Sequence, residues 1–190
     1  MLRVFFQAEV ELRHREFQLD DHMVKCLQEI TEILTSEDSK FGLMLCGACG
    51  NGKTMFLFAL QNMINYLRDF NYFDGEKEEI GVRIIAAKDI SEYARVEYAK
   101  YLQIRDYARI LAIDDMGEEP HEVLDYGNFH NPIMDLIEHR YNYQLPVFIT
   151  TNLSPKEITT KYGERIGDRL CEMVGKVVFE KTIKYSYRRM

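Results

Sequence analysis

Residues 47–54 read Gly-Ala-Cys-Gly-Asn-Gly-Lys-Thr and match G-x-x-x-x-G-K-[ST], the pattern of a phosphate-binding loop. Glycines let backbone N–H groups approach a phosphate closely, because no side chain stands in the way. Lys53 supplies a positive charge for β- and γ-phosphates, and the Thr54 hydroxyl is a suitable ligand for Mg²⁺. The residues expected to bind the nucleotide are Gly47, Ala48, Cys49, Gly50, Asn51, Gly52, Lys53, Thr54 and Met55.

The segments on either side of this loop have the patterns that a phosphate-binding loop requires. Residues 41–46 form a short apolar run, which predicts a buried strand. Residues 55–71 follow with helical spacing, and the N-terminus of such a helix directs its partial positive charge at the phosphates. A glycine-rich turn with an incidental lysine is the alternative, and this context argues against it.

Strand and helix patterns alternate along the rest of the chain. Further strands are predicted at 82–87, 109–113, 146–150 and 176–179. Helices are predicted at 89–105, at 132–143 with Asn131 as cap, and at 154–173 with an interruption at Gly163; residues 71–79 and 117–131 are predicted loops. This alternation predicts an α/β fold: a mostly parallel five-stranded sheet with helices on both faces.

The N-terminal segment gives a less regular pattern. Residues 2–13 alternate apolar and polar positions, which favours a strand, with a helix as the alternative. From Asp20 or Asp21 the chain continues as an amphipathic helix to about Leu34. We expect residues 1–38 to form a short N-terminal extension and residues 39–190 to form the nucleotide-binding domain.

Composition restricts the class of protein. The 190 residues, 46% apolar and 29% charged, suit one globular domain. No apolar run approaches the ~18 residues of a membrane span, so no membrane partner is expected. The start of the chain lacks the features of a signal peptide, and with four cysteines this predicts a reducing, cytoplasmic location. Cys46 and Cys49 have C-x-x-C spacing, but we favour two small residues that fit the loop over a redox or metal pair.

The net charge of −7 argues against a protein that coats DNA by charge alone. Residues 181–190 nevertheless form a local basic strip with two tyrosines. A solvated terminal strand and a contact with nucleic acid both fit this strip.

Polar side chains follow two of the predicted strands. Asp114 ends the strand at 109–113, and ligands gather at the carboxyl ends of such strands, so we expect Asp114 to hold Mg²⁺ with Thr54. Asp115 is placed to polarise the attacking water; a solvated carboxylate is the alternative. Asn152 would face the γ-phosphate if its strand lies between the loop strand and the Asp114 strand. The alternative for Asn152 is an N-cap of the next helix.

These motifs together resemble those of the AAA+ helicase loaders, the DnaC/DnaI/IstB group, over about residues 40–188. The resemblance rests on the segments 47–54, 113–119, 149–153, 165–170 and 186–188. It implies an AAA+ P-loop NTPase of the ASCE type with ATP and Mg²⁺ as cofactors. It also implies that Asn152 positions water and that Arg169, with Arg165 one turn earlier, reaches the γ-phosphate of a neighbouring subunit. The alternative for Arg169 is a surface helix residue paired with Asp168 or Glu172. Arg188 is similar to the family's second nucleotide-sensing arginine.

The resemblance implies ATP hydrolysis in DNA replication or in movement of a mobile element. Expected partners are other copies of the chain, arranged head to tail, then a replicative helicase or transposase, and single-stranded DNA. Members that load helicases carry a separate N-terminal domain, whereas only residues 1–46 precede the loop here, which makes helicase loading itself less expected. The alternatives are a nucleotide-gated interaction protein that does not hydrolyse ATP and, with less support, a small-molecule kinase.

Overall fold

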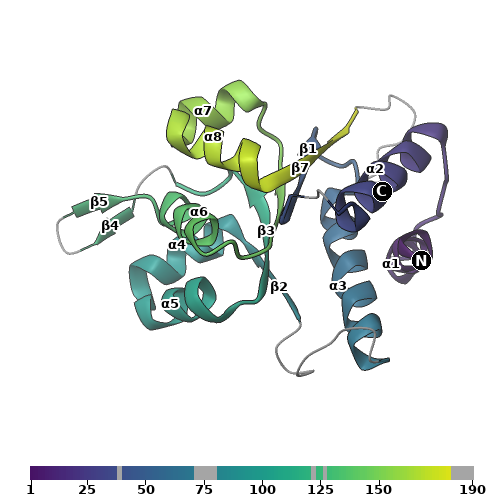
Figure 1. The fold of residues 1–190 in the computed structure, drawn as a ribbon, viewed down its shortest axis with the longest axis horizontal. Helices are drawn as coiled ribbons and strands as arrows, with labels where there is room; N and C mark the ends of the chain where they lie inside the picture. The colour runs from purple at the N-terminus through teal and green to yellow at the C-terminus, as the bar shows by residue number, and fades with distance from the viewer. Residues whose placement is uncertain (38–39, 71–80, 121–122, 126–127, 181–190) are drawn as a thin grey trace.

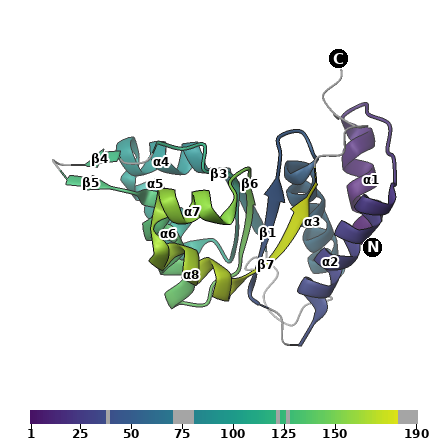
Figure 2. The same cartoon turned by 90° about the horizontal axis from the view of Figure 1, so that it is seen from above.

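Five parallel strands form the central sheet of the computed structural model, which describes residues 1–37, 40–70, 81–120, 123–125 and 128–180. The strands are β1 (Gly42–Gly47), β2 (Val82–Ala86), β3 (Ile110–Met116), β6 (Val147–Thr151) and β7 (Val174–Phe179). Figure 1 shows this sheet between two groups of helices. The strand order is β2-β3-β6-β1-β7, so β6 lies between β1 and β3, as the labels in Figure 2 show. Every neighbouring pair is parallel, which confirms the predicted α/β fold.

Helices cover both faces of this sheet (Figure 2). One face carries α1 (Leu2–Leu12), α2 (Asp21–Thr35) and α3 (Lys53–Asp69). The other carries α4 (Ala87–Val96), α5 (Tyr98–Tyr107), α6 (Pro132–Asn142), α7 (Pro155–Tyr162) and α8 (Glu164–Met173). Because side chains alternate along a strand, β1 supplies Leu43 and Leu45 to the first core and Met44 and Cys46 to the second.

Residues 2–12 form the helix α1, so the predicted strand was wrong. Leu2, Phe6 and Val10 recur every four residues and are buried, whereas Val4 is 68% exposed. The ring of Phe6 stacks on Phe56 of α3 with centroids 3.9 Å apart. The apolar residues fit both a period of two and a spacing of four, and packing on α3 selects the helix. Residues of α1 and α2 pack in the same hydrophobic core as residues of α3. The domain boundary expected after residue 38 stays a prediction.

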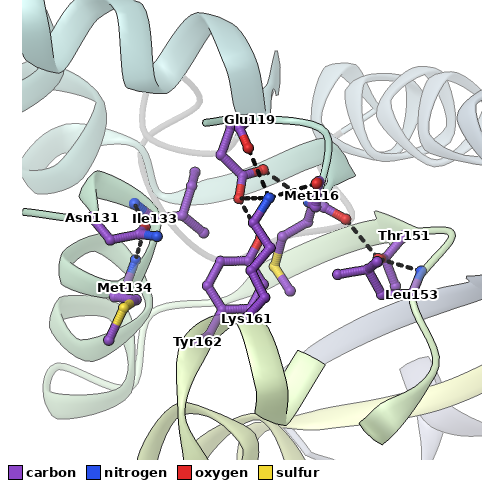
Figure 3. Close-up of polar contacts among 10 residues, drawn as sticks. Met116, Glu119, Asn131, Ile133, Met134, Thr151, Leu153, Lys161 and Tyr162 are labelled. Carbon is purple, nitrogen blue, oxygen red and sulfur yellow. Dashed lines mark hydrogen bonds and ion pairs between the residues drawn. The ribbon is translucent and has the colours of Figure 1, made fainter. Parts of the chain in front are cut away.

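One local prediction was confirmed and two need correction. Asn131 caps α6 as predicted, accepting hydrogen bonds from the amides of Ile133 and Met134 (Figure 3). The predicted helix at 89–105 is divided between α4 and α5 at Glu97, where φ is −134° and ψ is 56°. The predicted loop 117–131 contains an antiparallel hairpin that extends away from the sheet, formed by β4 (Val123–Asp125) and β5 (Asn128–His130). Within the described ranges, no helix is long and apolar enough to cross a membrane.

Candidate nucleotide-binding site

Lys53 lies at the centre of the predicted phosphate-binding loop. It is the first residue of α3, and only 5% of it is exposed. Its Nζ donates to the carbonyl oxygens of Gly47 at 2.7 Å and Ala48 at 2.9 Å, and to Oδ1 of Asn152 at 2.9 Å. Burial lowers the pKa of Lys53, and the nearby Asp115 carboxylate opposes this shift. The loop and the residue that follows β6 therefore meet at one cation, and the predicted role of Asn152 towards the γ-phosphate stays a prediction.

The loop glycines are required for different physical reasons. Gly47 and Gly50 have φ values of 140° and 91°, which L-residues rarely adopt. A Cβ on Gly47 would lie 2.1 Å from the carbonyl oxygen of Phe179, whereas around Gly50 no atom lies within 4 Å of that position. Close packing of β1 against β7 thus demands a glycine at position 47, in addition to the predicted approach of a phosphate.

Asp114 and Thr54, the two residues that the sequence assigns to Mg²⁺, lie next to each other. The Thr54 hydroxyl donates to Oδ1 of Asp114 at 3.0 Å, and the hydroxyl of Thr150 donates to the same oxygen at 2.6 Å. Mg²⁺ at nucleotide sites is held by one or two protein oxygens, with phosphates and water completing its shell. Thr54 and Asp114 fit that donor set. Sequence reasoning missed Thr150, although the polar run at the end of β6 was the signal.

A bulge in β3 determines how Asp115 is presented. The register between β3 and β6 shifts between Ile113 and Met116, and Asp115 within the bulge has φ = +53°. Its amide donates to Oγ1 of Thr150 at 2.8 Å. A left-handed residue other than glycine is uncommon and costs conformational energy. Here that conformation lets the exposed Asp115 line the cavity beside the loop.

This cavity, of about 260 Å³, opens between the loop and the end of α1. Residues 49–55, Asp115 and Asn152 line it, together with Arg13, Arg15 and Phe58. Arg13 pairs with the carboxylate of Glu9 and lies over the ring of Phe58, 5.0 Å from its centroid. Sequence reasoning missed both arginines, because a strand at 2–13 gave no reason to bring them to the loop. The basic run of residues 13–15, directly after α1, was the available signal.

Asn152 is not the cap of the following helix, which was its alternative role. The N-cap of α7 is Ser154, whose hydroxyl accepts from the amide of Glu157 in a capping box. Asn152 is exposed, accepts from Lys53, and donates to Oε1 of Glu118 at 3.4 Å. Its side chain is therefore directed to the loop.

Solved structures of DNA replication proteins have this same arrangement of strands and helices. The DnaC helicase loader aligns with a TM-score of 0.64 and 20% identity, covering 86% of this chain and 93% of that chain. DnaI aligns with a TM-score of 0.60 and 19% identity, and 94% of each chain is covered. AMPPCP-bound DnaA from Aquifex aeolicus aligns with a TM-score of 0.58 and 17% identity, covering 90% of this chain and 50% of that chain. The chain shares the fold of these solved structures. No protein-family model and no curated protein matches the sequence.

The two predicted arginines of α8 lie against α6. Arg169 has a side chain 14% exposed, with Nη1 2.7 Å from Oε1 of Glu138 and the guanidinium over Tyr141, 5.1 Å from the ring centroid. Arg165 contacts the same Glu138 oxygen at 3.2 Å, and its side chain is 71% exposed. These contacts join α8 to α6. The role of the two arginines towards a neighbouring subunit stays a prediction. Arg188 and the basic strip 181–190 lie outside the described residues.

Proposed function

We propose that this AAA+ protein binds ATP with Mg²⁺ and hydrolyses it, acting in DNA replication or in a DNA transaction of a mobile element. One observation carries the proposal: residues from three strand ends converge on a single loop. Lys53 contacts Asn152 at 2.9 Å, and Thr54 contacts Asp114 at 3.0 Å. A cation, a metal-ligand pair and an amide at one anion-binding loop are the groups that phosphoryl transfer needs.

Each group has a distinct task in this proposal. Lys53 and the amides that begin α3 bind the phosphates, and their positive charge offsets the charge that develops in the transition state. Thr54 and Asp114 hold Mg²⁺, which supplies further charge stabilisation when it is bound. Asp115 accepts the proton of the attacking water, and Asn152 orients that water. Arg13 and Arg15 add positive charge at the outer wall of the cavity.

Assembly and partners belong to the same proposal. Arg169 would act on the γ-phosphate of an adjacent copy of the chain, which requires a head-to-tail oligomer. A replicative helicase, a transposase or single-stranded DNA would be the target of the nucleotide-driven change. The similarity to solved helicase loaders supports a replication partner. The four cysteines are all free, which fits the reducing cytoplasm expected from the sequence.

A specific contact favours one alternative, a nucleotide-gated protein that does not hydrolyse ATP. The guanidinium of Arg169 is occupied by Glu138 and covered by Tyr141 within its own chain. An arginine held in this way stabilises α8 against α6 and leaves the γ-phosphate of a neighbour without its cation. The site would then bind ATP and gate an interaction without turnover.

Titration calorimetry with ATP and Mg²⁺ tests the binding step. Lys53→Ala should weaken ATP binding at least about 100-fold, since about 2.7 kcal/mol of phosphate contacts is lost. Lys156→Ala, at an exposed position of α7, is the matched control and should bind as the wild type does. Unchanged affinity in Lys53→Ala would refute the site.

Turnover separates hydrolysis from the gating alternative. Asp115→Asn should retain ATP binding while phosphate release falls about 100-fold or more, because the base is lost. Phosphate release equal to that of the wild type would contradict the role of Asp115. A wild type that binds ATP tightly and releases no phosphate, also at concentrations where it self-assembles, would favour the gating protein.

A further inference from the structure

A buried polar network links the turn after β3 to α7 (Figure 3). At its centre is Glu119, of which 3% is exposed. Its Oε2 accepts from the amide of Gly117 at 2.8 Å, and its Oε1 accepts from the hydroxyl of Tyr162. Lys161 lies 3.2 Å from Oε1 of Glu119 and also donates to the carbonyl oxygens of Gly117 at 2.6 Å and Glu119 at 2.7 Å. The network therefore joins the last turn of α7 to the turn that follows β3.

The members of this network depend on one another. A buried carboxylate is costly unless charged and hydrogen-bonding partners compensate it, and Glu119 has both. Burial raises the pKa of Tyr162, as does its hydrogen bond to Glu119, so the phenol keeps the proton that it donates. Removal of one partner would leave the others buried and incompletely paired. The turn after β3 is thus held in one conformation.

This turn is packed directly against the end of β6. The Thr151 hydroxyl donates to the carbonyl oxygen of Met116 at 2.6 Å and accepts from the amide of Leu153 at 3.1 Å. A Cβ on Gly117, where φ is +113°, would lie 2.7 Å from the Leu153 side chain. Asp115 directly precedes Met116, whose carbonyl oxygen accepts from Thr151. Asn152 lies between Thr151, the last residue of β6, and Leu153, the residue that packs against Gly117.

We propose that Glu119, Lys161 and Tyr162 are positioning residues for Asp115 and Asn152. None of the three lines the 260 Å³ cavity, so they act through the backbone that carries the two site residues. The inference rests on the proposed function, because it concerns the groups that face the γ-phosphate. It assigns α7 the task of holding the left-handed Asp115 and the amide of Asn152 at the distances that hydrolysis requires.

The test compares ADP with ADP plus aluminium fluoride, a mimic of the transferred phosphoryl group, in the presence of Mg²⁺. The wild type should bind the aluminium fluoride complex more tightly than ADP. Lys161→Met should bind ADP within about 2-fold of the wild type and lose about 10-fold or more of the preference for the complex, since small misplacement costs up to about 100-fold. Lys156→Met on the same helix should keep the full preference, because residue 156 is exposed.

Tyr162→Phe serves as a milder second variant in case Lys161→Met does not fold, and its turnover should show a lower kcat with an unchanged KM. If both network variants keep the wild-type preference for the aluminium fluoride complex, the inference is overturned and the proposed function is not affected. Equal weakening of ADP and its complex would also overturn it, because the network would then only support folding. A wild type that binds neither ligand would overturn the proposed function first, and this inference with it.

Discussion

Gly47 and Gly50 show how one motif position can satisfy two demands at once. Both have backbone conformations that suit a phosphate-binding loop, but only Gly47 is also packed against Phe179. The first glycine thus belongs as much to the β1–β7 contact as to the site. A motif alone does not separate these contributions, because it records residue type and not what surrounds it.

Alanine at these positions should therefore have unequal effects on stability. Gly47→Ala should lower the free energy of unfolding by about 3 kcal/mol or more, because its Cβ meets a backbone oxygen and its φ is strained. Gly50→Ala has only the strain and should lower it by about 1–2 kcal/mol. Denaturant unfolding of both variants measures the difference. Equal losses would mean that β7 moves away at little cost.

Helix α1 changes the composition of the site as well as the fold. Its buried face packs on α3, the helix that begins with Lys53. Its end brings Arg13 and Arg15 to the cavity. Phe56 of α3 links α1 to β7, because its ring stacks on Phe6 and contacts the ring of Phe179, whose centroid lies 5.2 Å away. The N-terminal helix is thus part of the structure that supports the phosphate-binding loop.

Removing the aromatic contact tests this support. Phe6→Ala should lower the free energy of unfolding by about 3–5 kcal/mol, the usual cost of a cavity left by a buried ring. Val4→Ala lies on the exposed side of the same helix and should change it by no more than about 0.5 kcal/mol. Thermal or urea unfolding distinguishes the two. A small effect of Phe6→Ala would show that α1 packs only loosely on α3.

For the molecule as a whole, the arrangement of the candidate site bears on whether one copy of the chain completes it. The groups around Lys53 come from the carboxyl ends of β1, β3 and β6. The candidate finger, Arg169, contacts Glu138 of α6, and Arg165 beside it is far more exposed. Assembly would have to release Arg169 from its own chain or use Arg165 in its place.

Mixing inactive variants tests for a shared site. Arg169→Ala and Asp114→Asn should each lack turnover alone, and together should recover part of it, because one interface then has an intact carboxylate and an intact arginine. Asp114→Asn mixed with Asp115→Asn is the control and should recover nothing, since both changes affect the same half of the site. Phosphate release measures the recovery. Failure of the first mixture would argue for a site complete within one chain.

The amino-acid sequence predicted the alternation of strands and helices and the strand–loop–helix unit. It also predicted which side chains lie near the loop: Lys53, Thr54, Asp114 and Asn152. These features depend on local patterns, since side-chain period, apolar runs and glycine spacing act over a few neighbouring residues. Parallel strands also place their carboxyl ends at one edge, which brings distant site residues together without further information.

Other features depended on contacts between residues far apart in the chain. Packing on α3 made residues 2–12 a helix and brought Arg13 and Arg15 to the cavity. Asp115 has its left-handed conformation within the bulge of β3. The Thr150 hydroxyl donates a hydrogen bond to the Asp114 carboxylate and accepts one from the amide of Asp115. The hydrogen bond from Tyr162 of α7 to Glu119 joins segments more than forty residues apart. Such contacts form only when elements pack, because the free energy of burial and pairing belongs to the assembled core and not to any one segment.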